Sequence, residues 1–380
     1  MPVISSEARN LFVNILIIEP YLTGSHKAWA EGYQKHSRHR IDLLSLPGNF
    51  WKWRMHGGAV TLAREFLCKD LKPDVLLVTD MLDLTTFLAL TRKKTTGIAT
   101  AVYFHENQLA YPWSPQDRDV QKSRDSHYGF INYTTALAAD RVFFNSSYNQ
   151  KSFLNELQRF LKHFPDHKDL RNVERIRAKS TVLPLGLDLA RFDRHKREAR
   201  ELNPKTPLVL WNHRWEFDKN PGEFFKALFR LADKGLDFEV ALLGECFSRQ
   251  PEAFLQARER LGARIVHFGY CEGEAEYASW LWRADLLPVT SNQDFFGASV
   301  AEAIACGCHP ILPRRLAYPE LIPAELHNEI LYDTFDELLN RLEAAIVAVV
   351  PKDERLARAV RQFDWQTMAQ RYDDAFQRMI

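Results

Sequence analysis

The sequence has 380 residues, of which 46% are hydrophobic, and this length and composition predict two domains that each bury a core. Its 50 basic residues stand against 49 acidic ones, so the net charge of +1 excludes a global field that draws the chain to nucleic acid or membrane. The five cysteines suggest neither a disulfide framework nor a zinc site, and neither a signal peptide nor an apolar run of about 18 residues is evident. We therefore expect a cytoplasmic protein.

The first half of the sequence alternates short apolar runs with helical stretches, which is typical of an open parallel sheet. The first run leads through the string E-P-Y-L-T-G-S-H into a helix expected to begin near Lys27. Ligands of such sheets lie at the carboxyl ends of the strands, so Gly24 and Ser25 are expected at a binding site. The G-x-G-x-x-G fingerprint of dinucleotide binding is absent. Strands are expected at residues 14–19, 41–46, 75–79 and 99–104, with helices at 58–67 and 84–93.

His105 follows the last of these strands, in the string F-H-E-N-Q-L-A-Y-P-W. A histidine at a strand end is well placed for chemistry, and the alternative is a histidine hydrogen-bonded within the core. Residues 112–125 predict a mobile loop, and its D-R-D does not follow a strand, so we do not expect a D-x-D metal site there. The unit continues with a helix capped by Ser146 and closes with a strand at 181–185.

Two segments are rich in basic residues, namely residues 168–179 before the closing strand of the first unit and residues 191–200 in the linker that follows it. A solvated helix face is the ordinary explanation of such charge, and contacts with the phosphates of a polyanionic acceptor are the alternative.

The second half opens with an apolar run at residues 208–212 and the string H-R-W-E-F-D-K-N-P. Arg214 and Lys219 lie five positions apart in the loop that follows the strand, where a guanidinium and an ammonium can both meet a diphosphate. Surface charges at a turn are the alternative. Further strands are expected at 238–243 and 264–269, and helices at 273–283, 335–350 and 365–376, the last with an apolar stripe for packing.

Residues 290–311, with the sequence T-S-N-Q-D-F-F-G-A-S-V-A-E-A-I-A-C-G-C-H-P-I, predict a loop that passes from a strand into an Ala-rich helix. Amide groups at a helix start lack intrahelical partners, so the loop is suited to bind a phosphate. Asp294 and Glu302 stand eight positions apart, a spacing that lets one acid meet a sugar and the other a ribose. The alternative is that both acids merely favour the first turn of a surface helix.

An acid followed after seven residues by Glu, with F-G between them, resembles the nucleotide-sugar signature of family-four retaining glycosyltransferases. The first acid of that family is usually Glu, whereas this chain has Asp294, which is shorter by one methylene. The resemblance implies an α/β fold of the GT-B type, in which two facing Rossmann-like parallel-sheet domains are joined by a C-terminal crossover helix. We expect an acceptor domain at residues 1–195, a nucleotide-sugar domain at 196–362, and the helix at 363–380, packed back on the first domain.

A narrower resemblance rests on the long strings E-P-Y-L-T-G-S-H, Y-F-H-E-N-Q-L-A-Y-P and D-F-F-G-A-S-V-A-E-A, which together resemble the tRNA-queuosine mannosyltransferase family. It implies transfer of mannose from GDP-mannose to the cyclopentenediol of queuosine at anticodon position 34 of a tRNA, with retention of configuration and without a metal or other cofactor. The implied catalytic residues are His105, Asp294, Arg214 and Lys219. The implied donor-binding residues are Gly24, Ser25, Arg214, Lys219, Asp294, Phe296, Gly297, Ala298 and Glu302.

Two other functions stay open at the level of sequence. One is a glycosyltransferase of the same fold that uses another nucleotide sugar on a lipid or small-molecule acceptor, for which the basic and aromatic string F-W-K-W-R-M at 50–55 is a candidate membrane segment. The other is a non-catalytic tRNA-binding protein with a degenerate transferase fold. Residue types alone do not choose guanine over uracil or mannose over glucose, and they specify neither the oligomeric state nor the tRNA contact surface.

Overall fold

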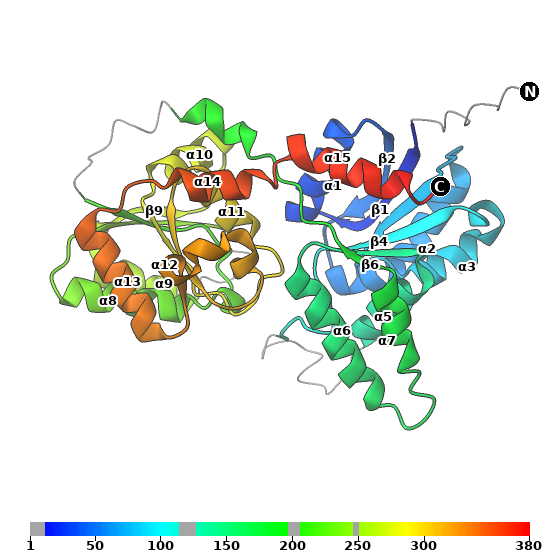
Figure 1. Ribbon diagram of the computed structural model, residues 1–380, viewed down its shortest axis with the longest axis horizontal. Coiled ribbons are helices and arrows are strands. Elements are labelled where there is room, and N and C mark those ends of the chain that lie inside the picture. The colour runs from blue at the N-terminus through cyan, green and yellow to red at the C-terminus, as the bar shows by residue number, and fades with distance from the viewer. Residues whose placement is uncertain (1–11, 114–126, 197–205, 246–250) are drawn as a thin grey trace, which may run out of the picture. The chain divides into compact units, whose positions relative to one another are not determined.

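The computed structural model describes residues 12–113, 127–196, 206–245 and 251–380 (Figure 1). These residues form two compact units. The first, unit 1, contains residues 12–111, 127–187 and 365–380, and the second, unit 2, contains residues 112 and 113 and the described part of 188–364. The D-R-D string and residues 197–205 lie outside the described residues.

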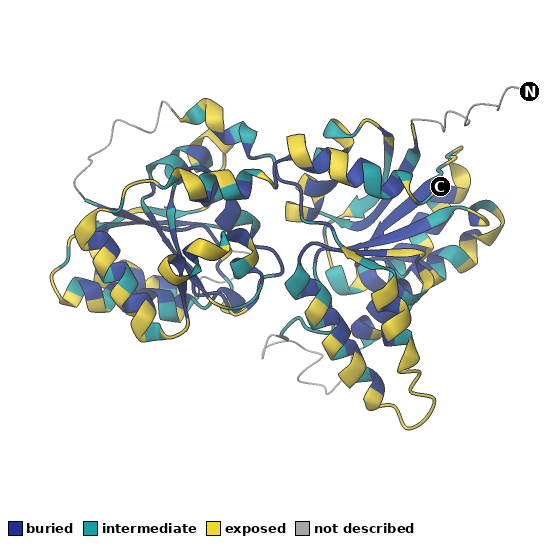
Figure 2. Cartoon of the chain, viewed as in Figure 1, coloured by how far each residue is buried: buried dark blue, intermediate teal, exposed yellow. Residues whose placement is uncertain are grey.

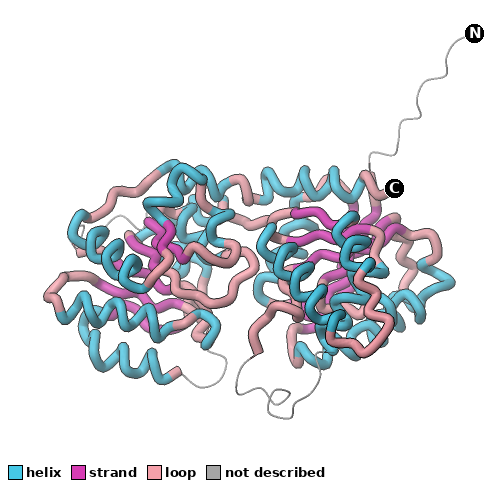
Figure 3. Tube along the Cα trace, turned by 60° about the horizontal axis from the view of Figure 1, so that its bottom comes forward, coloured by secondary structure: helices cyan, strands magenta, loops and turns pink. Residues whose placement is uncertain are grey.

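Unit 1 is built on a six-stranded parallel sheet with the strand order β2-β1-β3-β4-β5-β6. Its strands are β1 Asn14–Leu22, β2 Arg40–Pro47, β3 Val75–Thr79, β4 Ala99–Phe104, β5 Arg141–Phe144 and β6 Ser180–Val182. The helices of this unit are α1 Gly24–His36, α2 Trp51–Cys68, α3 Leu84–Thr95, α5 His127–Ala138, α6 Ser147–Lys162, α7 Arg171–Ala178 and α15 Trp365–Gln377. Strands alternate with helices along the chain, as the apolar runs predict (Figure 3).

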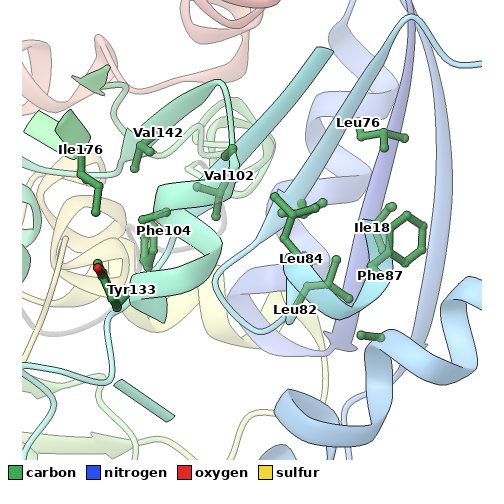
Figure 4. Packing of buried hydrophobic residues seen from close by; sticks show 14 of the residues in the cluster. Ile18, Leu76, Leu82, Leu84, Phe87, Val102, Phe104, Tyr133, Val142 and Ile176 are labelled. Atoms are coloured by element: carbon green, nitrogen blue, oxygen red, sulfur yellow. The ribbon is translucent and has the colours of Figure 1, made fainter. Parts of the chain in front are cut away.

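The core of unit 1 lies between this sheet and its helices. Strand side chains such as Ile18, Leu76 and Val102 pack with Phe87 of α3 and Tyr133 of α5, and all of them are buried (Figure 4). The central strands β3 and β4 are buried on both faces, whereas helices such as α6 expose one side to solvent (Figure 2). Continuous apolar strands and amphipathic helices are the pattern that this two-layer burial requires.

Two helices of unit 1 begin earlier than predicted. α1 starts at Gly24 rather than near Lys27, and α2 starts at Trp51, seven positions before the expected start at residue 58. The aromatic string at residues 50–55 therefore forms the first turns of a helix. Ser146 caps α6 as predicted, because its hydroxyl accepts a hydrogen bond from the Asn149 amide at 2.9 Å.

The C-terminal helix α15 belongs to unit 1 and packs on α1, as the fold type implies. Its apolar stripe is fully enclosed. The Trp365 ring fills the space beside Gly32 and Gly186, where a Cβ atom would lie 2.1 Å and 2.5 Å from the ring. The Tyr372 hydroxyl accepts from the Trp29 indole at 3.0 Å, so polar contacts also hold the helix in place.

Unit 2 contains a second six-stranded parallel sheet, with the order β12-β11-β10-β7-β8-β9. Its strands are β7 Leu208–Trp211, β8 Glu239–Leu243, β9 Ile265–Gly269, β10 Leu286–Pro288, β11 His309–Pro313 and β12 Leu331–Tyr332. Its α-helices are α8 Pro221–Asp233, α9 Glu252–Leu261, α10 Glu274–Arg283, α11 Ala298–Ala305, α12 His327–Ile330, α13 Phe335–Ala348 and α14 Glu354–Arg361. A second core of large apolar side chains lies within this unit. Of the helices that the structure describes, none is both long and apolar enough to cross a membrane.

Candidate functional site

The loop between β10 and α11 in unit 2 is held in shape by Asp294. Its Oδ1 atom accepts hydrogen bonds from the backbone amides of Phe296 at 3.2 Å and Gly297 at 2.7 Å. Its Oδ2 atom accepts from the Tyr318 hydroxyl at 3.2 Å and lies 3.4 Å from the Lys219 ammonium. Burial alone would raise the pKa of Asp294, but Lys219 and the two amides bring it below its ordinary value. Asp294 is therefore an ionised anchor of the loop.

Gly297 lets the chain turn from this loop into α11. Its φ of 90° lies in the left-handed region, and a Cβ atom would be 3.1 Å from a ring carbon of Tyr318 and 3.2 Å from Leu321. Only glycine fits this conformation and this space without strain. Two of the amides expected at a diphosphate already donate to Asp294, whereas the amide of Ala298 belongs to the first turn of α11, where helices leave amides unpaired.

Two cations lie after β7, in the loop that the sequence predicts. The Lys219 ammonium is buried, donates to the Gln293 carbonyl at 2.7 Å and is 3.4 Å from Asp218. The Arg214 side chain is 47% exposed, with its guanidinium 3.6 Å from Glu216. One cation is thus fixed against the Asp294 loop, and the other is partly exposed to solvent.

Glu302 of α11 is paired within unit 2. Its carboxylate lies 2.9 Å from the Arg191 guanidinium and accepts a hydrogen bond of 2.9 Å from the Tyr277 hydroxyl. Burial raises the pKa of Glu302, and Arg191 opposes that shift. Arg191 begins the segment 191–200 that the sequence offers for phosphate contacts, and in the structure it pairs with this acid.

His213 is a buried residue of this unit that sequence reasoning missed. Its Nδ1 atom lies 3.2 Å from the Ser299 hydroxyl on α11, and its Nε2 atom is buried without a partner among the described residues. Burial and the Lys219 charge lower the pKa of His213 to about 3, so the ring is neutral. The backbones of His213 and Gly244 lie close together: a Cβ atom on Gly244 would be 2.0 Å from the carbonyl oxygen of His213. The sequence offered one indication that His213 belongs to the site, because it directly precedes Arg214 in the same loop.

The predicted residues of unit 1 gather at the carboxyl edge of its sheet. Gly24 and Ser25 open α1, both are exposed, and Gly24 has a φ of 49° with open space around it. His105 directly follows β4, and its amide donates to Asp80 at 2.8 Å. The ring is buried 4.2 Å from that of His26, and its Nε2 atom has no partner among the described residues.

Glu19, His26 and Asp80 surround His105 and were not predicted as site residues. The Glu19 carboxylate lies 2.8 Å from His26 Nδ1, and both residues are buried. Burial would lower the pKa of His26, but Glu19 raises it to about 9. Burial, opposed by His26, raises the pKa of Asp80 to about 8. Glu19 and His26 stand seven positions apart in E-P-Y-L-T-G-S-H, so the string itself carried the signal.

Burial and the neighbouring His26 charge hold the pKa of His105 well below its ordinary value. His105 is therefore a neutral imidazole beside a charged one. A neutral ring with an unpartnered nitrogen can accept or donate one hydrogen bond, depending on its tautomer.

Two groups of described residues have the types and distances that could hold a metal ion, namely Glu19, His26 and His105 in unit 1 and His267, Cys271 and Glu276 in unit 2. In the first group Glu19 already contacts His26 Nδ1 at 2.8 Å, so a cation at that nitrogen would have to replace this contact. In the second group Cys271 lies 3.8 Å from His267 Nε2, whereas Glu276 lies 3.9 Å from the other ring nitrogen.

The structure brings Asp294, Lys219, Phe296 and Gly297 into direct contact, as described above. Arg214, Ala298 and Glu302 belong to the same unit. Gly24, Ser25 and His105 belong to unit 1. Unit 2 thus offers a buried ammonium, an exposed guanidinium and a glycine-kinked helix start, which suit an anionic ligand.

Models of known families match both units. A model described as tRNA-queuosine alpha-mannosyltransferase N-terminal matches residues 14–187, and a model described as glycosyl transferases group 1 matches residues 192–363.

Curated relatives match most of the chain. The tRNA-queuosine alpha-mannosyltransferase of Drosophila melanogaster is 38% identical over 335 residues, which cover 87% of this chain and 86% of that protein. A GDP-mannose-dependent alpha-(1-6)-phosphatidylinositol dimannoside mannosyltransferase of Mycobacterium tuberculosis is 27% identical over 310 residues, or 79% of this chain and 73% of that protein.

Solved glycosyltransferase structures share the fold over nearly the whole chain. HepE of Anabaena, solved with UDP and glucose, aligns with a TM-score of 0.66 at 14% identity and covers 96% of this chain and 100% of its own. Sucrose-phosphate synthase of Thermosynechococcus elongatus aligns with a TM-score of 0.68 at 14% identity, covering 97% and 99%. At such identities the likeness establishes the GT-B fold alone.

Proposed function

The chain belongs to the tRNA-queuosine alpha-mannosyltransferase family, and from this premise we propose that it transfers mannose from GDP-mannose to queuosine in tRNA. It is a glycosyltransferase with a GT-B fold. The observation that carries the proposal is the match of the acceptor-side half, residues 14–187, to a family model described by this acceptor. A match confined to residues 192–363 would support a glycosyltransferase of any acceptor.

The donor proposal rests on two relatives whose names point to mannose, one of them GDP-mannose-dependent. We place the diphosphate at Arg214, Lys219 and the Ala298 amide, since Lys219 contacts the β10–α11 loop, Arg214 is the exposed cation after β7, and Ala298 begins α11. Asp294 orients the loop and holds the sugar. Glu302 accepts from the ribose, for which its carboxylate must share Arg191 and Tyr277 with the ligand.

The proposed reaction retains the anomeric configuration through the leaving diphosphate itself. The bond from the anomeric carbon to the diphosphate oxygen breaks, the acceptor hydroxyl oxygen forms the new bond on the same face, and its proton passes to the diphosphate. Negative charge grows on the diphosphate as the bond breaks, and fixed cations stabilise that charge. The other task of the protein is to hold the acceptor hydroxyl beside the leaving diphosphate, on the same face of the sugar, which removes an entropic barrier.

We assign His105 to the sugar or the acceptor, and we keep the exposed Gly24 and Ser25 as donor-binding residues. The unpartnered Nε2 atom of His105 is suited to hydrogen-bond a hydroxyl of the sugar or of the acceptor. Burial and the charge of His26 keep His105 neutral, and the His26 ring packs beside it with the ring centres 4.2 Å apart. We further propose that the reaction needs no metal, because Arg214 and Lys219 supply the positive charge, and that the enzyme works in the cytoplasm, where its tRNA acceptor resides.

Nucleosides of tRNA from cells with and without the gene test this function. We expect queuosine that carries the mass of one added hexose only in cells that contain the gene. Complementation with the wild-type gene should restore the hexose, whereas Lys219→Ala should not. Identical queuosine nucleosides in both strains would refute the proposal that queuosine is the acceptor.

A further inference from the structure

The start of α2 presents aromatic side chains to solvent at the carboxyl edge of the unit 1 sheet. Phe50 is 80% exposed and Trp53 is 64% exposed, although Phe50 directly precedes α2 and Trp53 lies in its first turn, and other residues of this helix, such as Met55, are buried. Helix α2 follows the carboxyl end of β2, and at Gly48 a Cβ would be 2.3 Å from Thr23, which precedes Gly24. These aromatics therefore adjoin the loop already assigned to the site.

The backbone at Phe50 is strained. Its φ of 53° and ψ of 57° are left-handed, a conformation that glycine and asparagine adopt readily and that bulky residues avoid. The exposed ring buries little surface that could offset this cost. An aromatic residue at this position lowers the stability of the free protein. Strained residues of this kind are found mainly at binding and active sites, so the strain at Phe50 points to a ligand.

Trp53 packs against its own helix. At Gly57, one turn further on, a Cβ would be 2.7 Å from two carbons of the Trp53 ring. The glycine leaves room for the indole beside α2, and the high exposure of the residue leaves ring surface for a planar partner. A ring held in this way loses little conformational entropy when another ring stacks on it.

Cations are interleaved with these rings. The Lys52 ammonium lies 5.5 Å from the centre of the Trp51 ring and 6.0 Å from that of Tyr128, the second residue of α5. Arg54, four positions after Phe50, donates from Nε to the Pro47 carbonyl at 3.1 Å, and this hydrogen bond holds its guanidinium at the turn before α2. Alternating aromatic and basic side chains match the bases and phosphates of a single-stranded nucleic acid.

A groove of about 470 Å³ continues this surface on the other side of α5. It is lined by Leu109 and by polar residues of α6, among them Tyr148 and Lys151. Leu109 packs on Gly129, where a Cβ would be 2.7 Å away, and Gly129 directly follows Tyr128 of the aromatic cluster. Aromatic surface and groove therefore meet at the first turn of α5.

We propose that Phe50 and Trp53 stack against unpaired bases of an RNA loop, and that Lys151 in the groove contacts the backbone of the same strand. This inference rests on the proposed function, in which the acceptor is a tRNA whose modified nucleoside must reach the carboxyl edge of unit 1. It assigns the RNA surface to residues 50–54 and the groove. The basic segment 168–179, which the sequence also offered for phosphate contacts, has no role in it.

A membrane surface is the competing partner for the same aromatics, since Val60 and Leu67 extend the exposed apolar side of α2. The observations favour RNA because Lys52 and Arg54 flank the exposed Trp53 in the sequence and because a polar groove, unsuited to lipid chains, lies close by.

Binding of the full chain to queuosine-bearing tRNA, measured by fluorescence anisotropy at several salt concentrations, tests the proposal. We expect Trp53→Ala and Phe50→Gly each to weaken tRNA binding about tenfold or more, with little change in its salt dependence. Trp53→Phe should recover most of the affinity. Lys151→Ala should lower the slope of log K against log salt by about 0.7, the value for one contact with a single strand.

Matched controls separate binding from folding. Phe50→Gly relieves the left-handed strain, so its melting temperature should stay equal to or above that of the wild type while tRNA binding falls. Phe12→Ala removes an aromatic that is 70% exposed before β1, at the amino edge of the sheet, and should bind tRNA as the wild type does.

The outcomes also distinguish this inference from the function. Wild-type tRNA affinity of the Phe50→Gly, Trp53→Ala double variant, with normal transfer, would overturn the surface and leave the mannosyltransferase standing. Loss of tRNA binding in that variant, in a protein that modifies no queuosine, would uphold the surface and refute the function. Sedimentation with vesicles of phosphatidylcholine and phosphatidylserine that depends on the two aromatics, with unchanged tRNA affinity, would assign the surface to membranes.

Discussion

Lys219 carries the buried positive charge at the proposed diphosphate site, where it contacts the Gln293 carbonyl and Asp294. We expect Lys219→Ala to lower kcat by about 100-fold or more, because charge on the departing diphosphate grows toward the transition state. Single-turnover transfer measures the rate, and calorimetric binding of GDP should show a much smaller loss. Arg214→Ala should act in the same direction.

A control for these variants is Lys226→Ala on the adjacent helix α8. Lys226 is exposed, and its ammonium lies 4.7 Å from the Phe335 ring, outside the β10–α11 loop. Its removal should leave the rate unchanged. If both Lys219→Ala and Arg214→Ala transfer mannose at rates within a factor of three of the wild type, the diphosphate does not bind at these two residues.

His105 offers one unpartnered buried nitrogen on the acceptor side. We expect His105→Ala to depress mannose transfer strongly while the affinity for GDP stays nearly intact, because the cations proposed for the diphosphate belong to unit 2. His105→Gln, which places an amide in the same space, should recover part of the turnover. Wild-type turnover of His105→Ala would show that the residue is only a core histidine, and so would loss of folding in both variants.

The Glu19–His26 pair makes stability depend on pH. The pKa of His26 is raised from 6.5 to about 9, so the pair stabilises unit 1 fully below pH 6.5 and less as pH rises through 9. Asp80, whose pKa is raised to about 8, shifts stability in the same direction as it ionises. We expect the melting temperature to fall by several degrees between pH 6.5 and 9.

Thermal denaturation across this pH range, followed by circular dichroism, is the measurement. Glu19→Gln removes the partner that raises the pKa of His26, so its melting temperature should be lower at pH 6.5 and vary less with pH. An equally steep decline in Glu19→Gln would contradict the assignment.

At the scale of elements, the β10–α11 connection depends on Gly297. We expect Gly297→Ala to weaken GDP binding and to destabilise the protein by about 1–3 kcal/mol, because its left-handed backbone disfavours a side chain and Tyr318 and Leu321 crowd the new Cβ. Gly222→Ala in α8 has open space and should be neutral or stabilising. Calorimetry and thermal denaturation compare the two. Equal GDP affinity and stability for both variants would show that the turn tolerates a side chain.

Apolar patterns predicted the elements whose burial follows from sequence alone. The strands at 75–79 and 99–104 match the structure in both bounds, and the stripe of the last helix is buried as expected. The start of α2 was missed because its first turns carry exposed aromatics instead of an amphipathic pattern, and because Phe50 caps it in a left-handed conformation that no propensity anticipates.

Site residues were predictable where a motif places a charge after a strand, as with Lys219 and Asp294. Their partners were not, because hydrogen bonds such as those from the Phe296 and Gly297 amides to Asp294 depend on the turn that the loop adopts. The same applies to His26 and Glu19, whose contact joins a strand to the first turn of the next helix.

For the whole molecule, the two units divide the proposed work. Residues 188–364 hold the cations and the loop for a nucleotide sugar, and unit 1 holds His105, the groove and the aromatic start of α2. A net charge of +1 gives no general attraction to RNA, so recognition must depend on a local surface of stacking and paired charge. Specificity for one nucleoside is then a property of unit 1.

The central claim is that the chain joins mannose to queuosine, and transfer by the purified protein tests it most directly. Labelled GDP-mannose is incubated with a tRNA that carries queuosine and with the same tRNA that carries guanosine at that position, in the presence and absence of a chelator. We predict one α-linked hexose per queuosine, none on the guanosine tRNA, and no effect of the chelator. Label that reaches a lipid or small sugar but no queuosine tRNA, or a tRNA that is bound while the donor stays intact, would contradict the claim.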